Sequence, residues 1–508
     1  MTPAVILLVA LVAEDPAVLR NAPRDDAPAQ ATLWRGDWVE VRGETAGFLR
    51  VYDHRHERPG YLRPSQVRQY PVDAASAPEA AAIVRFLRDA SGFESLGIGY
   101  AALALRASPA GADQTELLAA VGTMAERLAR RASARKSDAG AWTQLGSAQR
   151  SPSREAAGIL PGFQRLIDAT LAAHLEVAAS YGVSFKLVEP TTPGGRALVC
   201  YDGEAWAQVL ATPNAAPVER ARAALSLSVD PCADPAAPPA VARAFNDRRL
   251  QALTSIDFVA ERAMPTALVG RVRLRRAEAY AWRAFDQARQ GQLDAAARAE
   301  GSAVRELALT DRGVLAPEDG ALYEEAAVRV AASRWAGEPA SADTRPRPLA
   351  VAVAARGPGE SCVRILERAT GAMLGERCTF GVVWANALRW APSGTVATLA
   401  VQPLPAWTEL WVLRRGSDGK SWTFDALTPA VTDPDRGAGY VEAAGTSPDG
   451  GKLLVVREAH VGGRASRRFQ VLSAPTLAVD KWADDAGKLL AFKRWSSPAW
   501  RASTLALR

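Results

Sequence analysis

Histidine is scarce in this sequence, with four residues in a chain of 508. None of them lies in an HExxH pattern or in the local context of a catalytic triad. The GxSxG, P-loop and GxGxxG patterns are also missing, so the sequence marks no nucleophile and no loop that binds a nucleotide phosphate. We therefore expect a non-enzymatic protein that uses no cofactor.

Long apolar runs are missing too. No segment reaches the roughly 20 apolar residues that span a bilayer, so we expect no permanent membrane span. The start, MTPAVILLVALVA, is a shorter apolar run followed by two acidic residues. Residues 1–13 resemble a secretory signal peptide without the usual basic start, which predicts a periplasmic or otherwise exported protein. The alternative is a buried first β-strand.

Cysteine is limited to four residues, with no CxxC or cysteine–histidine spacing that would indicate zinc. Four cysteines in an exported chain are compatible with two disulfides. Cys362 and Cys378 flank a segment whose midpoint is Thr370, and a hairpin turning there would place them opposite each other. Cys200 and Cys232 form the remaining candidate pair. The alternative is four buried thiols.

Neither sign of charge dominates, because 61 basic residues stand against 55 acidic ones. This small excess disfavours a nucleic-acid partner, for which a strong basic patch is typical. The hydrophobic fraction of 48% allows a large core. The length predicts about three domains, and the patterns described next predict a multidomain α+β fold.

Short alternating β-type runs broken by Gly, Pro and Asp predict a small β-barrel over residues 14–72. The stretch from Ala17 to Tyr70, with its LWRGDWVEV and PGYLRPSQV segments, resembles the bacterial SH3-like family. The inserted loop DHRHERP departs from the family pattern. The residues that carry the resemblance are Leu19, Arg20, Pro23, Leu33, Gly36, Asp37, Val39, Phe48, Arg50, Val51, Gly60, Tyr61 and Val67.

Alanine-rich periodicity of three and four residues predicts a helical domain of roughly eight to ten helices over residues 78–338. Within residues 183–210, shorter β-branched runs around a PGG sequence predict a small inserted hairpin. The polar stretch at residues 133–155 is expected to be a loop. Around Gly291, which is expected at a turn, the pattern weakly resembles tetratricopeptide hairpins, although plain antiparallel alanine-rich helices have the same pattern.

A linker-like segment, GEPASADTRPRP, precedes short β-runs over residues 347–508. There, LRWAPSGTVATLAV and GTSPDGGKLLVV resemble the WD-type repeats of bacterial envelope β-propellers such as the Tol-system periplasmic protein. The resemblance implies an all-β, propeller-like domain with a tight turn in each copy. RWSSPAW at Arg494 is a candidate third copy. The matching residues are Trp390, Pro392, Ser393 and Gly394 in one copy and Ser447, Pro448, Asp449 and Gly450 in the other.

Aromatic residues in the β-rich ends are the candidate ligand-binding groups. Most of the 14 tryptophans are expected to fill cores, while a subset exposed at a groove would stack on peptide or sugar. In the N-terminal barrel the candidates are Trp34, Trp38, Tyr52 and Tyr61. Strand alternation predicts that Trp38 and Tyr61 point to one face and Trp34 and Tyr52 to the other, so at most one pair lines a groove.

The four histidines have simple structural interpretations. His54 and His56 lie beside acidic residues in the inserted loop, where a weak metal site is conceivable, but a solvated loop is simpler and we expect no metal. His174 is expected on or partly within an amphipathic helix, and His460 in a Gly-rich turn.

These features predict a non-enzymatic binding or scaffolding protein of the bacterial cell envelope that recognises a protein, peptide or peptidoglycan ligand. One alternative is a cell-wall hydrolase, or its accessory subunit, with an SH3-like targeting module. Another is a structural subunit of a secretion or lipoprotein-sorting assembly.

Overall fold

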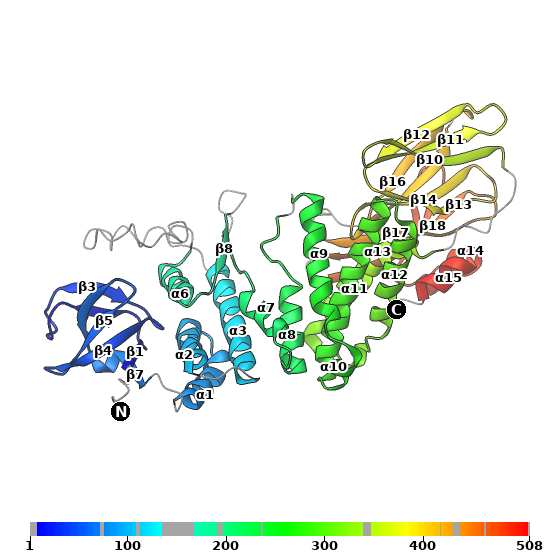
Figure 1. The fold of residues 1–508 in the computed structure, drawn as a ribbon. Coiled ribbons are helices and arrows are strands. Elements are labelled where there is room, and N and C mark those ends of the chain that lie inside the picture. Colours follow the sequence, from blue (N-terminus) through cyan, green and yellow to red (C-terminus); the bar gives the residue numbers. More distant parts are fainter. Residues whose placement is uncertain are drawn as a thin grey trace. The chain divides into compact units, whose positions relative to one another are not determined.

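The computed structural model combines helices with β-sheets (Figure 1). By contacts the chain divides into two compact units, Met1–Asp234 and Pro235–Arg508. The boundary lies inside the predicted helical region, so each unit combines helices with strands. The structure describes residues 8–71, 76–107, 112–134, 167–189, 197–234, 237–338, 347–416, 418–429, 437–461 and 464–505.

The first unit begins with a seven-stranded antiparallel sheet in the order β3-β2-β6-β5-β4-β1-β7. One face carries an aliphatic core built from alternating strand positions such as Val39, Val51 and Leu62. The predicted β-structure of residues 14–72 is therefore present, with one strand more at its start. The strands and the short 3-10 turn among them are β1 Leu8–Val12, β2 Ala17–Arg20, β3 Ala29–Leu33, β4 Trp38–Thr45, β5 Phe48–Asp53, β6 Arg58–Leu62, η1 Pro64–Gln66 and β7 Val67–Pro71.

Strand β1 changes the interpretation of the first residues. Its last four residues are buried, and it pairs with β4 on one side and β7 on the other. Cleavage after Ala13 would remove this inner strand and leave both neighbours without their partner. The signal peptide predicted for residues 1–13 does not fit this arrangement. The alternative interpretation, a buried first strand, does.

Helices pack against the face opposite the aliphatic core, and a hairpin packs on α3 in the same apolar cluster. A shared apolar cluster joins Val9 and Leu11 of β1 to residues of α1, α2, α3 and α6, so the sheet and these helices have a common core. The elements are α1 Ala77–Arg88, α2 Glu94–Ala107, α3 Ala112–Ala134, α6 Ala169–Ser180, β8 Phe185–Val188, β9 Leu198–Tyr201, α7 Glu204–Ala211 and α8 Pro217–Leu227.

The hairpin predicted within residues 183–210 is confirmed, because β8 and β9 pair antiparallel there, although α7 occupies the end of that range. The PGG sequence between the strands lies outside the described residues, as does the loop predicted at 133–155 apart from its first two residues, which end α3. Cys200 on β9 forms a disulfide with Cys232, as predicted. The bond ties the hairpin to the segment after α8.

The second unit begins with packed helices. Gly291 lies at the predicted turn between α11 and α12 with a φ of 75°, a left-handed conformation that favours glycine. Small residues such as Ala277, Ala281 and Ala303 are buried in the cluster shared by α11, α12 and α13. The elements are α9 Pro239–Thr254, α10 Phe258–Arg262, α11 Thr266–Arg289, α12 Leu293–Ala308, η3 Arg312–Val314, η4 Pro317–Asp319, α13 Gly320–Ser333 and η5 Arg334–Ala336.

Strands β10–β12 form a three-stranded antiparallel sheet, and the strands after them form two antiparallel meanders. We call β13–β16 repeat 1 and β17–β20 repeat 2; a short parallel pairing of β15 with β17 joins them. The strands are β10 Leu349–Gly357, β11 Glu360–Glu367, β12 Met373–Thr379, β13 Val382–Trp390, β14 Val396–Leu404, β15 Trp407–Arg415, β16 Trp422–Leu427, β17 Ala438–Thr446, β18 Lys452–Val461, β19 Arg464–Ser473 and β20 Val479–Ala483.

The two predicted turns occupy equivalent places in the repeats. Pro392–Gly394 connects β13 to β14, and Pro448–Gly450 connects β17 to β18. In each turn the backbone N–H of the residue before the proline donates to the carbonyl of the first residue of the next strand, at 2.9 Å in repeat 1 and 3.0 Å in repeat 2. The prediction of matching inter-strand turns is confirmed.

Apolar clusters stack these sheets in sequence. One cluster joins β10–β12 to repeat 1, another joins the two repeats, and a third joins repeat 2 to the C-terminal helices. The third copy predicted at Arg494 is wrong, because RWSSPAW spans the end of one C-terminal helix and the start of the next. Residues 347–508 are therefore not all β. The prediction for His460 is also wrong, since it is buried on β18. The last elements are η6 Ala486–Lys488, α14 Leu490–Trp495 and α15 Pro498–Leu505.

The second disulfide joins neighbouring strands of the three-stranded sheet. Cys362 on β11 and Cys378 on β12 are directly paired in register and bonded, as the hairpin centred on Thr370 predicts. No helix in the described part of the chain is both long enough and apolar enough to cross a membrane.

Candidate binding face on the N-terminal sheet

Strand register places three of the four candidate aromatic residues on one face of the N-terminal sheet. Tyr52 on β5 is paired with Glu40 on β4, and Tyr61 on β6 is paired with Arg50 on β5. Trp38 lies two residues before Glu40. Because side chains alternate along a strand, Trp38, Tyr52 and Tyr61 point to the same side, away from the aliphatic core.

Helices cover only part of this side of the sheet. Val9 and Leu11 are paired with Glu40 and Trp38 and lie in the core shared with the helices, and Trp38 borders that core. The part formed by β4, β5 and β6 is not covered in this way, and we call it the open face. It consists of Trp38, Glu40, Arg42, Arg50, Tyr52, His54 and Tyr61, of which Arg42, Arg50 and His54 are exposed and the others are half-buried.

Three rings form the centre of the open face. The imidazole of His54 stacks on the indole of Trp38, with centroids 5.1 Å apart and planes at 18°. The ring of Tyr52 meets the same imidazole edge to face at 4.8 Å. The guanidinium of Arg42 covers the Tyr52 ring at 4.2 Å from its centroid. The face therefore presents a preformed aromatic surface with a cation at one side.

Glu40 links the charged groups of the open face. Arg42 donates to its carboxylate through Nε at 3.1 Å and through Nη2 at 3.0 Å, and His54 Nε2 lies 2.8 Å from Glu40 Oε2. The Arg42 hydrogen bond and then the His54 hydrogen bond hold the pKa of Glu40 below its ordinary value. This arrangement fixes the His54 ring and leaves both signs of charge beside apolar ring surfaces.

The inserted loop DHRHERP anchors the open face to the rest of the unit. Arg55 donates to Asp37 at 3.0 Å and to Glu176 of α6 at 3.1 Å. His56 Nδ1 lies 2.5 Å from the buried carboxylate of Asp53. Burial raises the pKa of Asp53, but the hydrogen bonds from His56 and the loop backbone outweigh it, and the pKa lies below its ordinary value.

The two loop histidines do not share a metal site. His54 is paired with Glu40, whereas His56 is paired with Asp53 on the other face of the strand. In the described ranges, the group whose geometry suits a metal ion is Cys362, Glu376 and Cys378, and both of its cysteines are engaged in a disulfide.

The predicted division of the aromatic residues into two opposed pairs is wrong. Trp38, Tyr52 and Tyr61 share the open face, and the apolar core of the sheet includes none of the four candidates. Trp34 lies apart after β3, where its ring meets the edge of His174 at 6.4 Å. The prediction from sequence missed Glu40, Arg42 and His54. For Glu40 and Arg42 the signal was their two-residue spacing after Trp38 along β4, which places all three on one face. For His54 it was the same spacing after Tyr52 at the end of β5.

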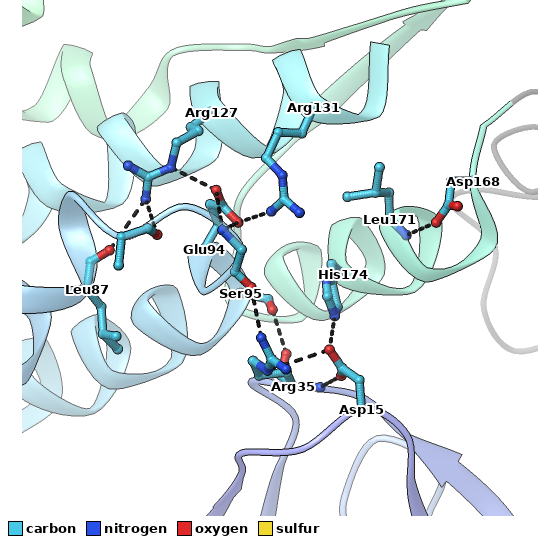
Figure 2. A network of polar contacts seen from close by, with 12 residues as sticks. Asp15, Arg35, Leu87, Glu94, Ser95, Arg127, Arg131, Asp168, Leu171 and His174 are labelled. Atoms are coloured by element: carbon cyan, nitrogen blue, oxygen red, sulfur yellow. Dashed lines mark hydrogen bonds and ion pairs between the residues drawn. The ribbon is translucent and has the colours of Figure 1, made fainter. Parts of the chain in front are cut away.

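Polar contacts join the loops of the N-terminal sheet to α2 and α6 (Figure 2). His174 Nε2 lies 3.0 Å from the carboxylate of Asp15, which also accepts the backbone N–H of Arg35 at 2.5 Å. The hydroxyl of Ser95 donates to the carbonyl of Arg35 at 2.5 Å. Burial raises the pKa of Asp15, but the hydrogen bonds from His174 and the Arg35 N–H outweigh it and lower the pKa.

Glu94 extends this network into α3, as Figure 2 shows. Its fully buried carboxylate accepts a hydrogen bond from Arg127 at 2.7 Å and contacts Arg131. Burial raises the pKa of Glu94, but hydrogen bonds from backbone N–H groups and Arg127 outweigh it, so the pKa lies below its ordinary value. The network fixes the loops of the sheet on α2 and α6, and α2 on α3.

Comparisons with protein-family models, with curated proteins and with solved structures find no match to this chain.

Proposed function

We propose that this chain is a non-enzymatic binding or scaffolding protein of the bacterial cell envelope. Its open face would hold an extended peptide, either from peptidoglycan or from an envelope protein. The observation that carries the proposal is the aromatic group in which His54 stacks on Trp38 and meets Tyr52 edge to face, flanked by Glu40 and Arg42. Rings with charged edges suit a ligand that alternates apolar groups with amides and carboxylates.

Two resemblances support this proposal at the level of architecture. The N-terminal sheet occupies the segment that resembles the bacterial SH3-like family, and we propose that it is a barrel of that kind. The two repeats, with their equivalent turns, occupy the segment that resembles envelope β-propeller repeats. We propose a propeller-like stack of sheets that serves as a second recognition surface.

Export is supported by the disulfides rather than by the first residues. Cys200–Cys232 and Cys362–Cys378 use all four cysteines of the chain. Such bonds persist in oxidising compartments, which include the bacterial periplasm. We therefore keep a periplasmic or otherwise exported location as part of the proposal.

The acid–histidine pairs of the first unit favour binding over hydrolysis. Asp15 and Asp53 each hold a histidine and also accept backbone N–H groups. Carboxylates engaged in this way are typical of structural ion pairs, whereas a general base must reach a substrate proton.

The proposal is tested by retention of the full chain on purified peptidoglycan sacculi. We expect the Trp38→Ala, Tyr52→Ala double variant to lose about 2 kcal/mol of binding free energy, or roughly thirtyfold in affinity. Both residues are only half-buried, so the variant should keep the circular dichroism spectrum of the parent.

The matched control is Phe380→Ala, which removes an aromatic ring that is 66% exposed in the second unit. This control should be retained like the parent. Failure of the parent to bind sacculi contradicts the peptidoglycan assignment. Equal retention of the parent and the double variant contradicts the role of the open face.

A further inference from the structure

One face of repeat 2 carries basic residues that point the same way. Arg457 on β18 and Arg468 on β19 are directly paired in register, and Gln470 lies two residues beyond Arg468 on the same side. Trp482 on β20 is paired with Gln470 and continues this face. The guanidinium of Arg468 lies 5.2 Å from the centroid of the Trp482 ring.

These two arginines differ from their neighbours in having no acidic partner in the described chain. The ion pairs of repeat 2 join Lys452 to Asp480 and Arg467 to buried glutamates. Burial alone acts on Arg457 and lowers its pKa. Like charges placed directly opposite each other on two strands destabilise a sheet unless something of opposite sign compensates them.

Two buried polar atoms of the same face also have no hydrogen-bond partner within the described residues. They are Nε of Arg457 and Oε1 of Gln470, whose side chain belongs to a residue only 9% exposed. A buried polar atom without a partner costs free energy. In repeat 1 the equivalent places are held by Val401 and Trp411, which lie in an apolar cluster with β10–β12. Repeat 2 thus has polar groups where repeat 1 has core.

We propose that Arg457, Arg468, Gln470 and Trp482 form a binding site for the free C-terminal carboxylate of a peptide. A guanidinium binds a carboxylate through two parallel hydrogen bonds, and the second arginine adds charge at the mouth of the site. The backbone N–H of the same terminal residue is a donor suited to Gln470 Oε1. The terminal side chain packs on Trp482, which is 60% exposed.

A peptide C-terminus offers a planar carboxylate, an N–H and a side chain on one residue, whereas inorganic phosphate offers oxygen atoms and O–H groups but no apolar group that could pack on Trp482. We therefore propose a peptide C-terminus, and not a phosphate group, as the ligand of this site. The site lies within the second unit and does not depend on the open face or on the function proposed for it.

The test uses isothermal titration calorimetry on the full chain. The probes are the acetylated tetrapeptide Ala-Ala-Ala-Leu with a free C-terminal carboxylate, the same peptide with a C-terminal amide, and inorganic phosphate. We expect the free acid to bind at least roughly tenfold more tightly than either the amide or phosphate. No measurable binding of the acid, or equal binding of acid and amide, overturns the proposal, as does phosphate binding as tightly as the acid.

The informative variant is Arg457→Val, which installs the residue type of Val401 at the equivalent position of repeat 1. Because it removes a partly buried cation without a partner, it should unfold at the same or a higher temperature than the parent while binding of the acid peptide is lost. The matched control is Lys481→Gln, which removes one positive charge beside Trp482 but on the other face of β20. The control should bind like the parent. Retained binding in a folded Arg457→Val protein overturns the site.

Discussion

Gly36 shows how a single residue determines the contact between the N-terminal sheet and its helices. It lies just before β4 with a φ of 95°, and its carbonyl accepts a hydrogen bond from the Tyr181 hydroxyl at 2.7 Å. A Cβ at this position would meet the Ser95 carbonyl oxygen at 2.4 Å. The backbone conformation and the close approach to α2 both require glycine. The family resemblance includes this glycine, but its contact with a helix was not visible in the sequence.

We predict that Gly36→Ala destabilises the first unit more than Gly47→Ala does. Gly47 has a φ of 74° and no atom within 4 Å of an added Cβ. Its replacement should therefore cost only the left-handed backbone, about 1 kcal/mol. Gly36→Ala should cost about 1–3 kcal/mol more, because of overpacking against α2. Urea unfolding measures both values. Equal losses would show that the contact with Ser95 yields easily.

At the scale of elements, strand register is what the sequence did not reveal. Alternation within a strand was read correctly, but only pairing with the neighbouring strand shows which positions of two strands share a face. The pairing of Glu40 with Tyr52 therefore brought Trp38 and Tyr52 together against the prediction. In contrast, the Cys362–Cys378 hairpin follows from its midpoint alone, because hairpin register is set by the turn.

At the two ends of the chain, the sequence pattern fits more than one structure. An apolar run such as LLVALVA has the same composition in a signal peptide and in a buried strand, and only its pairing with β4 and β7 separates the two. The resemblance of RWSSPAW to a third repeat copy predicts a turn between strands at its Ser-Pro sequence. Pro498 instead begins α15, where a proline at the first helical position is favourable.

We predict that β1 is needed for the stability of the first unit. Leu11 is fully buried between the sheet and the helices, so Leu11→Ala in the full chain should cost about 2–5 kcal/mol. A chain that begins at Glu14 should lose the cooperative unfolding transition of this unit altogether. Thermal melts followed by circular dichroism compare the two forms with the parent. If the chain that begins at Glu14 melts like the parent, β1 is dispensable and the signal-peptide interpretation returns.

At the scale of the whole molecule, the two units have separate apolar clusters, and each contains a buried glutamate whose pKa is shifted in the opposite direction from that of the other. In the first unit, hydrogen bonds and ion pairs outweigh burial and lower the pKa of Glu94 from 4.5. In the second unit, burial and then the charge of Glu338 raise the pKa of Glu300 to about 7, against the opposing effect of Arg334. Glu300 also adjoins Gly337, with its carboxylate in the space that a Cβ would fill.

The signs of the two pKa shifts predict opposite pH dependence. A lowered pKa contributes stability above 4.5, and this contribution is lost as the pH falls below that value. A raised pKa means that the folded state holds the proton more tightly than the unfolded chain. Ionised Glu300 therefore costs stability as the pH rises from 4.5 through about 7, and the full cost is present above that range.

We predict that calorimetry separates these effects between two unfolding transitions, since each unit has its own core. Glu300→Gln should stabilise the second unit by about 1–3 kcal/mol at pH 8 and have no effect near pH 4, where the parent residue is protonated. Glu94→Gln should destabilise the first unit by about 3–5 kcal/mol at pH 7, because Arg127 and Arg131 lose the buried carboxylate that balances their charge. The difference in unfolding free energy between this variant and the parent should shrink in acid.

A Glu300→Gln effect that is the same at both pH values would show that the carboxyl of Glu300 does not titrate in this range. Movement of both transitions by either variant would show that the two units unfold as one.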